Sequence, residues 1–291
     1  MRCSHFTFVA LLVLSGIAPS FADESLQPDF GVTATFSIVA IDPETGECGA
    51  AVASKYPAVG KVVPYVRAGV GAFCTQHWHN PEWGEQALDL LESGQGSEAV
   101  LSTLLMNDRR RDQRQLAIID MRGRAANRNP AAAPSSSSYW GAMSGRFYAC
   151  QGNTLAGREV ITSMAQAFEE TGGSLSDRLM AALVAADCAG GDHRGRLAAG
   201  IRVAKEEHEG IWFELYVDKS DDAVMDLFDQ YVTVEHPAKG EWTYPGMPRP
   251  CSKTTGFDDA PVEKTISVSI PCEQPPSIRR RRFLDKLLHR R

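Results

Sequence analysis

Residues 35–54 read TFSIVAID, PETG and ECGAAVAS, and this stretch decides the predicted fold. Apolar and small polar residues alternate in its first segment, which is typical of a strand with one buried face. Asp42, Pro43 and Gly46 supply the conformations that a tight turn needs. The stretch therefore predicts a β-hairpin, with Thr35 at the first position of the first strand.

The rest of the chain shows strand-like and helix-like patterns in groups. A parallel sheet needs single helices between single strands, so this order does not suit it. Pairs of helices between groups of strands suit two antiparallel sheets packed together, with the helix pairs outside. We therefore predict one α+β domain over residues 35–234. Further strands are expected at 65–74, 115–120, 125–127, as a pair around Tyr139 and 147–151, and at 196–205 and 211–219, and helices after Pro81, from Ser97, and at 158–171, 176–189 and 221–232.

The N-terminus has the features of an export signal. Residues 1–22, MRCSHFTFVALLVLSGIAPSFA, combine a basic start, an apolar run and a small-residue ending. This is the order of a secretory signal peptide, with cleavage expected after Ala22. The apolar run is too short to span a bilayer, so we expect a secreted or periplasmic protein with no stable membrane span. Residues 23–34 then form an arm or pro-segment, and residues 235–291 form a proline-rich, basic tail.

The charge balance bears on the class of partner. The 291 residues include 30 Lys and Arg against 36 Asp and Glu, a formal net charge of −6. Nucleic-acid-binding proteins normally show a basic face, so this balance argues against a nucleic-acid partner. The basic run from Arg279 to Arg282 is interpreted as a solvated end of the tail. The sequence leaves the oligomeric state open, and a homodimer is one option.

Cysteine and histidine spacing gives no support for a metal or a cofactor. No cysteine pair has the CxxC spacing of a zinc or redox site. His77 and His79 would point to one face of an extended segment, but two ligands do not make a site. Removal of Cys3 leaves six of the seven cysteines, an even number that permits disulfides. We expect a bridge between Cys251 and Cys272, and buried thiols at Cys48, Cys74, Cys150 and Cys188.

Thr35 is the candidate nucleophile. A threonine at the N-terminus of a chain can attack a substrate, because its own α-amine takes the hydroxyl proton. That amine has an ordinary pKa of about 7.7 to 8, which suits a general base. In a chain cut after Ala22 the Thr35 nitrogen is still an amide. A second cleavage, between Ala34 and Thr35, is therefore required.

Five segments of the sequence carry a family resemblance. In order they are TFSIVAIDPETGECGAAVASK, VGKVVPYVRAGVGAFCTQ, NPEWG, QGNTLAG and AGGDHRGR. Together they resemble the DUF1028 family, a domain of unknown function placed in the N-terminal-nucleophile (Ntn) hydrolase superfamily. The resemblance covers residues 35–218. It implies a four-layer αββα sandwich, in agreement with the order of elements above, and it places Thr35 where the superfamily has its nucleophile.

Polar residues at the ends of predicted strands supply the other catalytic candidates. Lys55 ends the second hairpin strand, where its ammonium either lowers the pKa of the nucleophile or is simply solvated. Asn153 and Gln76 carry amides that can donate to an oxyanion, although such amides can equally tie a loop to backbone groups. Asn153 is the stronger of these two oxyanion candidates.

The candidates for substrate binding lie in three loops. Gln151 precedes Asn153 in the QGN segment, and Asn80 lies beside tryptophans that line a cleft or pack the loop. Arg194 and Arg196 could clamp a substrate carboxylate. The alternative is a structural ion pair between an arginine and Asp192. Both interpretations stay open at this point.

Two functions of different classes fit these residues. The first is a secreted amidohydrolase that acts on a small-molecule or peptide amide, with Thr35 as nucleophile and base after removal of residues 23–34. Asn153 and Gln76 would then bind the oxyanion. The second is a non-catalytic ligand-binding module on the same scaffold, in the periplasm or at the cell surface. In that protein the arm would persist.

Overall fold

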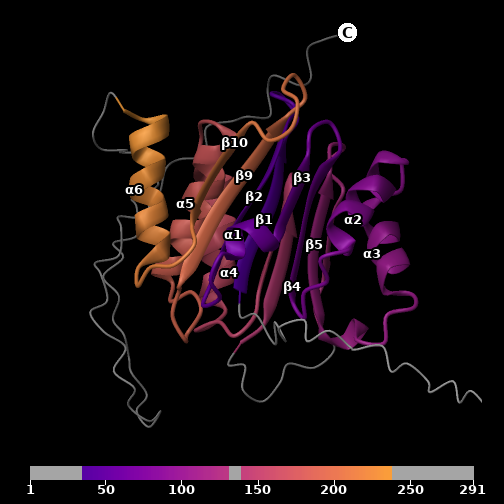
Figure 1. Cartoon of the computed structure of the whole chain (residues 1–291), viewed down its shortest axis with the longest axis horizontal. Helices are drawn as coiled ribbons and strands as arrows, with labels where there is room; N and C mark the ends of the chain where they lie inside the picture. The colour runs from indigo at the N-terminus through magenta and orange to yellow at the C-terminus, as the bar shows by residue number, and fades with distance from the viewer. Residues whose placement is uncertain (1–34, 131–138, 238–291) are drawn as a thin grey trace, which may run out of the picture. The chain divides into compact units, whose positions relative to one another are not determined.

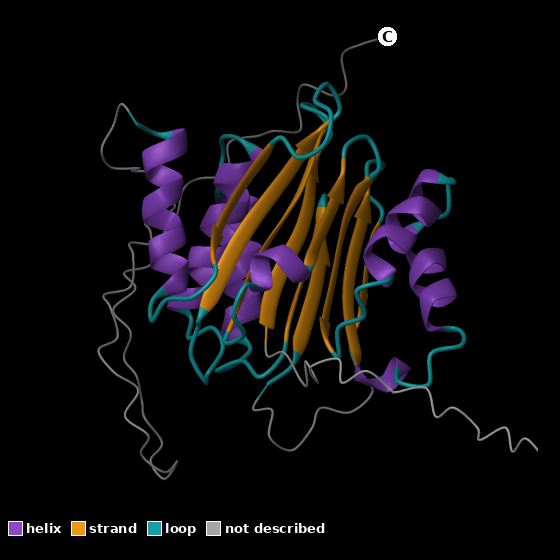
Figure 2. Ribbon diagram, in the orientation of Figure 1, coloured by secondary structure: helices purple, strands orange, loops and turns teal. Residues whose placement is uncertain are grey.

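The computed structural model describes residues 35–130 and 139–237. Within these ranges the chain forms two β-sheets with helices on their outer faces, as Figures 1 and 2 show. The strands are β1 (Thr35–Asp42), β2 (Glu47–Ser54), β3 (Pro64–Arg67), β4 (Gly71–His77), β5 (Arg114–Asp120), β6 (Ala125–Arg128), β7 (Gly141–Gly145), β8 (Tyr148–Gly152), β9 (Ala198–Lys205) and β10 (Phe213–Val217). The helices are α1 (Val59–Val62), α2 (Trp83–Glu92), α3 (Ser97–Leu105), α4 (Glu159–Glu170), α5 (Leu175–Cys188) and α6 (Ala223–Glu235), with a short 3-10 turn at Arg111–Gln113.

Both sheets are antiparallel, as predicted. The six-stranded sheet has the order β10-β9-β2-β1-β8-β7, and the four-stranded sheet has the order β3-β4-β5-β6. The predicted hairpin is confirmed, because β1 pairs with β2 from Thr35 opposite Ser54 to Asp42 opposite Glu47. The helices α4, α5 and α6 pack on the six-stranded sheet, and α2 and α3 pack on the other. The described residues thus form the predicted α+β sandwich.

Side chains of β1 show how the layers are filled. Phe36 and Ile38 belong to the apolar core beneath α4 and α5, whereas Val39 and Ile41 belong to the core between the two sheets. Since side chains alternate along a strand, Thr35 also faces the other sheet. The inter-sheet layer is therefore apolar along most of β1 and polar where β1 begins.

The predicted single strand over residues 65–74 is wrong. The chain reverses direction there and forms the β3–β4 hairpin, with Tyr65 opposite Phe73. Gly69 and Gly71 have φ angles of +70° and +144°, which L side chains rarely adopt. The glycines of this segment therefore make a turn, and Gly71 also lies close to the backbone of Ile119.

The predicted helices are present, with small differences at their ends. Ser174 caps α5 by accepting a hydrogen bond from the backbone N–H of Asp177 (3.1 Å), and the Asp177 carboxylate accepts from the Ser174 N–H (3.0 Å). The helix expected from Ser97 does begin there, since Ser97 is the first residue of α3, and its hydroxyl donates to the carbonyl of Arg124. The short helix α1 had no signal in the sequence.

The cysteines follow the prediction in three of four described positions. Cys48, Cys74 and Cys150 are buried free thiols. Cys188 is instead in a disulfide, so its expected state as a buried thiol is wrong. Its partner is not among the described residues. The expected Cys251–Cys272 bridge, the signal peptide, the arm and almost all of the tail also fall outside the described ranges.

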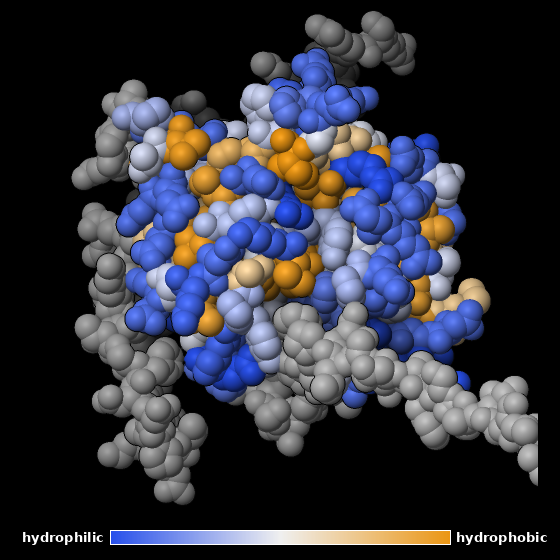
Figure 3. Space-filling model, viewed as in Figure 1, coloured by the Kyte–Doolittle hydropathy of each residue, from blue (hydrophilic) through white to orange (hydrophobic). Residues whose placement is uncertain are grey.

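The described surface carries scattered apolar side chains. In the view of Figure 3 most of the surface is hydrophilic, with apolar residues in small separate patches. The large exposed apolar side chains of the described residues are Val62, Met106, Trp212 and Val234, which belong to different parts of the fold. None of the helices in the described ranges is both long and apolar enough to cross a membrane.

The β3–β4 turn gives a stability prediction. A Cβ added at Gly71 would lie 2.1 Å from the backbone oxygen of Ile119, which cannot move without breaking β5. We expect Gly71→Ala to lower the free energy of unfolding by roughly 3 kcal/mol or more, measured by urea denaturation. Gly94→Ala is the matched control, since Gly94 also has positive φ but open space around it. Its cost should be about 1–2 kcal/mol. Equal losses of unfolding free energy in the two variants would contradict the close contact between Gly71 and the Ile119 backbone.

Candidate functional site

A group of polar side chains fills the inter-sheet layer where β1 begins. We call it the amide cluster, and all of its members are fully buried. It lies beyond the apolar part of the layer that contains Val39 and Ile41. The members are Thr35, Ser37, Ser54, Gln76, Gln115, Gln151 and Asn153.

Strand register brings these residues together. Thr35 lies opposite Ser54 on β2, and Ser37 lies opposite Gln151 on β8. In the other sheet Gln76 on β4 lies opposite Gln115 on β5. Directly opposed residues in an antiparallel pair point to the same face. Each pair therefore contributes two polar side chains to one end of the inter-sheet layer.

Thr35 is held at both its hydroxyl and its carbonyl. Its Oγ1 donates to Ser54 Oγ at 3.2 Å. Its carbonyl oxygen accepts from the backbone N–H of Asn153 (3.0 Å) and from Gln76 Nε2 (3.1 Å). Ser54 is fixed in turn, because its Oγ accepts from Tyr56 N (3.1 Å) and its carbonyl from Leu197 N (2.8 Å). The candidate nucleophile thus has a defined position.

Three of the predicted site residues join Thr35 in this cluster. Gln76 uses Nε2 to donate to the Thr35 carbonyl and to Gln115 Oε1 (2.7 Å), so this amide positions Thr35 in the present structure. Asn153 Nδ2 donates to Gln115 Oε1 at 2.9 Å. Gln151 Nε2 contacts the carbonyl of Cys74 at 3.4 Å, and its buried Oε1 has no hydrogen-bond partner among the described residues. The oxyanion and substrate roles of these amides stay predictions.

Two further predicted residues lie at the margin. Lys55 directly follows Ser54 and is exposed. Asn80 is partly exposed, and its side-chain oxygen accepts from the backbone N–H of Glu82 (3.2 Å) just before α2. In the structure Asn80 therefore organises the entry to a helix, and its predicted substrate contact stays untested.

The predicted arginines both form ion pairs. Arg194 Nε lies 3.3 Å from the buried Asp192 carboxylate. Arg196 pairs with the buried Asp187, where Nη2 donates to Oδ2 at 3.1 Å. Burial raises the pKa of Asp187 to about 6, against the effect of Arg196. The Arg194–Asp192 pair corresponds to the structural alternative left open by the sequence, whereas the sequence did not indicate Asp187 as the partner of Arg196. The loop still borders the cluster, because His193 N donates to the carbonyl of Thr154 at 3.2 Å.

Sequence reasoning missed three members of the cluster: Gln115, Ser37 and Ser54. Gln115 lies on the same face of β5 as the apolar residues Ala117 and Ile119 of the inter-sheet layer, so it occupies a position where a core residue is expected. A polar residue at a buried position of an alternating strand was the available signal.

Backbone strain is present beside the amide cluster. His77 and Thr154 directly follow Gln76 and Asn153, and they have φ angles of +65° and +55°. Such conformations are uncommon for residues other than glycine and are frequent at functional sites. His77 Nδ1 lies 2.6 Å from the carbonyl oxygen of Gln113, so this nitrogen carries the proton. Burial lowers the pKa of His77.

Other nucleophiles and metal ligands have little support among the described residues. Burial raises the pKa of Cys48, Cys74 and Cys150 to about 12, so these thiols are protonated at neutral pH. Within the described ranges, no three His, Cys, Asp or Glu residues are grouped as a metal site would need.

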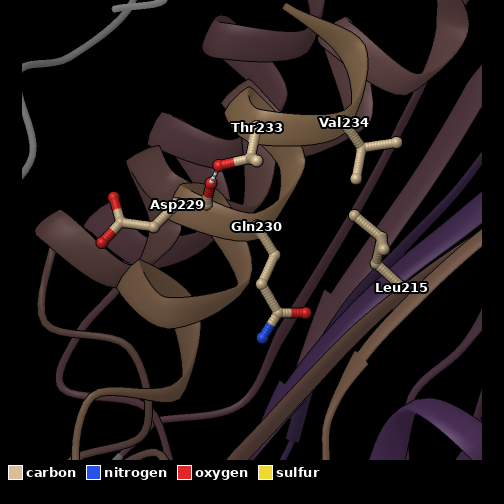
Figure 4. Close-up of a pocket in the computed structure, with 5 residues that line it drawn as sticks. All are labelled: Leu215, Asp229, Gln230, Thr233 and Val234. Atoms are coloured by element: carbon tan, nitrogen blue, oxygen red, sulfur yellow. Dashed lines mark hydrogen bonds between the residues drawn. The ribbon is translucent and has the colours of Figure 1, made fainter. Parts of the chain in front are cut away.

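A surface hollow lies apart from the amide cluster. It is lined by Leu215 of β10 and by Asp229, Gln230, Thr233 and Val234 of α6, as Figure 4 shows. The Thr233 hydroxyl is occupied within the helix, since it donates to the carbonyl of Asp229 at 2.9 Å. Two strands, β9 and β2, separate β10 from β1. We assign this hollow no part in the chemistry of Thr35.

His79, two residues beyond β4, gives a prediction of pH dependence. Burial, with a smaller effect of the Arg114 charge, lowers its pKa from 6.5 to about 4. The unfolded chain therefore binds this proton at higher pH than the folded chain, so stability should fall as the pH drops from about 6.5 to about 4. We expect His79→Gln to reduce that loss by roughly 2 kcal/mol, measured by urea unfolding at pH 7 and pH 5. The lowered pKa of His77 acts in the same direction, so His79→Gln should still lose some stability as the pH falls.

The exposed His208 provides the control. His208→Gln should leave the loss of stability between pH 7 and pH 5 as it is in the wild type. If His79→Gln lost as much stability between pH 7 and pH 5 as the wild type, His79 would not be the source of the pH dependence.

Comparison with known proteins adds to this geometry. The model of a family of unknown function, DUF1028, matches residues 35–227. A crystal structure of protein SPO2555 from Silicibacter pomeroyi, a DUF1028 protein, is similar with a TM-score of 0.63 and 30% identity, over 69% of this chain and 87% of that chain. No curated protein matches. The extent of the family match and the likeness to SPO2555 establish that the chain belongs to the DUF1028 family.

Proposed function

We propose that the chain is a secreted Ntn-type hydrolase of amide or peptide bonds, with Thr35 as its nucleophile. The observation that carries the proposal is the position of Thr35. Its hydroxyl and its carbonyl are both held at the polar end of an otherwise apolar layer. The match to the family model also begins at this residue, which suits a domain that starts with its nucleophile.

The chemistry requires a free α-amine, so the bond between Ala34 and Thr35 must be cut first. We propose that Thr35 Oγ1 attacks the carbonyl of Ala34 and displaces its own nitrogen, and that water then hydrolyses the resulting ester. Thr35 is fully buried in the uncut chain. Cleavage at this bond would free the α-amine of Thr35 to act as the base.

Hydrolysis then follows in two stages. The Thr35 amine takes the Oγ1 proton as Oγ1 attacks the amide carbonyl of the substrate. The resulting oxyanion accepts hydrogen bonds from nearby N–H groups. The C–N bond breaks, the leaving nitrogen takes the proton from the Thr35 amine, and water hydrolyses the ester. Asn153 is the stronger oxyanion donor, because only one N–H of its Nδ2 is directed at Gln115. Gln76 would have to give up one of its two present contacts.

The surroundings favour a neutral substrate group at the reacting centre. Amides and hydroxyls make up the cluster, and Arg194 and Arg196 are already paired with carboxylates. The exposed ammonium of Lys55 would act on the nucleophile only from the margin. The disulfide at Cys188 supports an oxidising compartment, in keeping with a secreted or periplasmic protein.

A second candidate, a non-catalytic binding module, is favoured by one observation. Gln76 uses both N–H bonds within the protein, as expected for a scaffold that only holds its shape. In that case residues 23–34 stay attached, and Thr35→Ala leaves ligand affinity unchanged.

Thr35→Ala tests the hydrolase directly. The change removes the nucleophile and one buried hydrogen bond, so hydrolysis of an amide and peptide library should fall at least about a thousandfold. The free energy of unfolding should fall by only about 1 kcal/mol. Mass spectrometry of the products measures the first effect and urea unfolding the second.

Thr103→Ala is the matched control, because Thr103 is exposed and its hydroxyl donates to the carbonyl of Ala99 within α3. It should retain wild-type hydrolysis. Activity retained in folded Thr35→Ala would end the proposal.

A further inference from the structure

We propose that Gln115 is the positioning residue of this site, through which the orientations of Gln76 and Asn153, and hence of Thr35, are fixed. The structural part of this proposal rests on the contacts of the amide cluster alone. Its effect on catalysis rests on the proposed function of Thr35.

Gln115 is the hub of the cluster. Its Oε1 accepts from Gln76 Nε2 (2.7 Å) and from Asn153 Nδ2 (2.9 Å). Its Nε2 donates to the carbonyl of Gly152 (2.9 Å) and to Asn129 Oδ1 (2.8 Å). It is fully buried, so water does not offer substitute partners. Both ends of this amide are therefore committed.

The direction of these bonds leaves a single arrangement. An amide nitrogen only donates and a carbonyl oxygen only accepts. The Gly152 carbonyl fixes which end of Gln115 is nitrogen, and Gln115 Oε1 then requires the nitrogen end of Gln76. Gln76 Oε1 in turn accepts from Ser37 Oγ at 2.7 Å. This orientation directs Gln76 Nε2 to the Thr35 carbonyl as well.

Gln115 also joins parts that are distant in the sequence. It belongs to β5 of the four-stranded sheet, while Gly152 ends β8 of the six-stranded sheet. Its Nε2 lies 2.8 Å from Asn129 Oδ1 and 3.4 Å from the carbonyl of Gly141. One side chain thus connects the two sheets and the two sides of the segment 131–138 to the contacts of Thr35.

The consequence for chemistry is geometric. Misplacement of a reacting group by about 1 Å can cost about a hundredfold in rate. Without Gln115, Gln76 and Asn153 lose a shared acceptor, and the carbonyl of Thr35 loses a fixed donor. We therefore expect slower reaction of Thr35 with little change in the binding of a reactant.

Gln115→Met tests this, with Gln113→Met as the matched control. Gln113 is exposed and two residues away. Gln115→Glu is the conservative variant, since its carboxylate keeps the acceptor for Gln76 and Asn153. The probe is a β-lactone, which Thr35 Oγ1 opens by attack at the carbonyl. The ring C–O bond breaks, the hydroxyl proton passes to the released oxygen, and the mass of the chain rises by that of the whole probe.

Intact mass spectrometry of the purified secreted protein follows acylation of the chain that begins at Thr35, over a range of probe concentrations. For Gln115→Met we expect the maximum rate to fall at least about tenfold, with the half-saturating concentration unchanged. The maximum rate of Gln115→Glu should lie between those of Gln115→Met and the wild type, and that of Gln113→Met should match the wild type. A wild-type maximum rate in folded Gln115→Met would overturn the positioning role, as would a change confined to half-saturation.

Crystal structures separate this inference from the proposed function. In Gln115→Met, Gln76 Nε2 should move beyond about 3.5 Å from the Thr35 carbonyl. An unmoved Gln76 would overturn the inference even if the variant reacted slowly. If wild-type protein is neither cleaved at Thr35 nor acylated, the hydrolase proposal fails, and the position of Gln76 in these structures still decides the role of Gln115.

Discussion

Two hydrogen bonds to the carbonyl oxygen of Thr35 organise one end of this molecule. One comes from the backbone of Asn153, which directly follows β8 of the six-stranded sheet. The other comes from the side chain of Gln76, on β4 of the four-stranded sheet. A buried polar group without a partner costs about 1–3 kcal/mol, so a cluster of amides between two sheets is stable only when its members satisfy one another. Strand register supplies that mutual satisfaction for Thr35, Gln76 and Gln115, and it leaves Thr35 in one position.

The cluster is not arranged for stability alone. An apolar layer continued to the end of the sheets would need no such network. The cluster instead keeps a buried Gln151 oxygen without a partner among the described residues, and the adjoining His77 and Thr154 have positive φ angles. Unsatisfied polar atoms and backbone strain are costs that proteins retain mainly where function requires them. Together with the buried amides, the unsatisfied Gln151 oxygen and the strain at His77 and Thr154 are the physical reason to place the site there.

Local patterns made most of the fold predictable. Alternation and turn residues predicted the β1–β2 hairpin, and periodicity predicted the paired helices, because both depend on nearby residues. The β3–β4 turn was missed since its glycines also fit one interrupted strand. In the site, Gln76 and Asn153 were predictable as amides at strand ends. Gln115 was not, because its importance arises only from its register with Gln76 and its contacts across the sheets.

The account depends most on whether Thr35 becomes an N-terminal residue. The most direct measurement is the intact mass and N-terminal sequence of the protein purified from its secreted location. A chain that begins at Thr35 is the predicted result, since only then can the α-amine act as the base. A stable chain that begins near Asp23 would contradict the account, because the nitrogen of Thr35 would still be an amide.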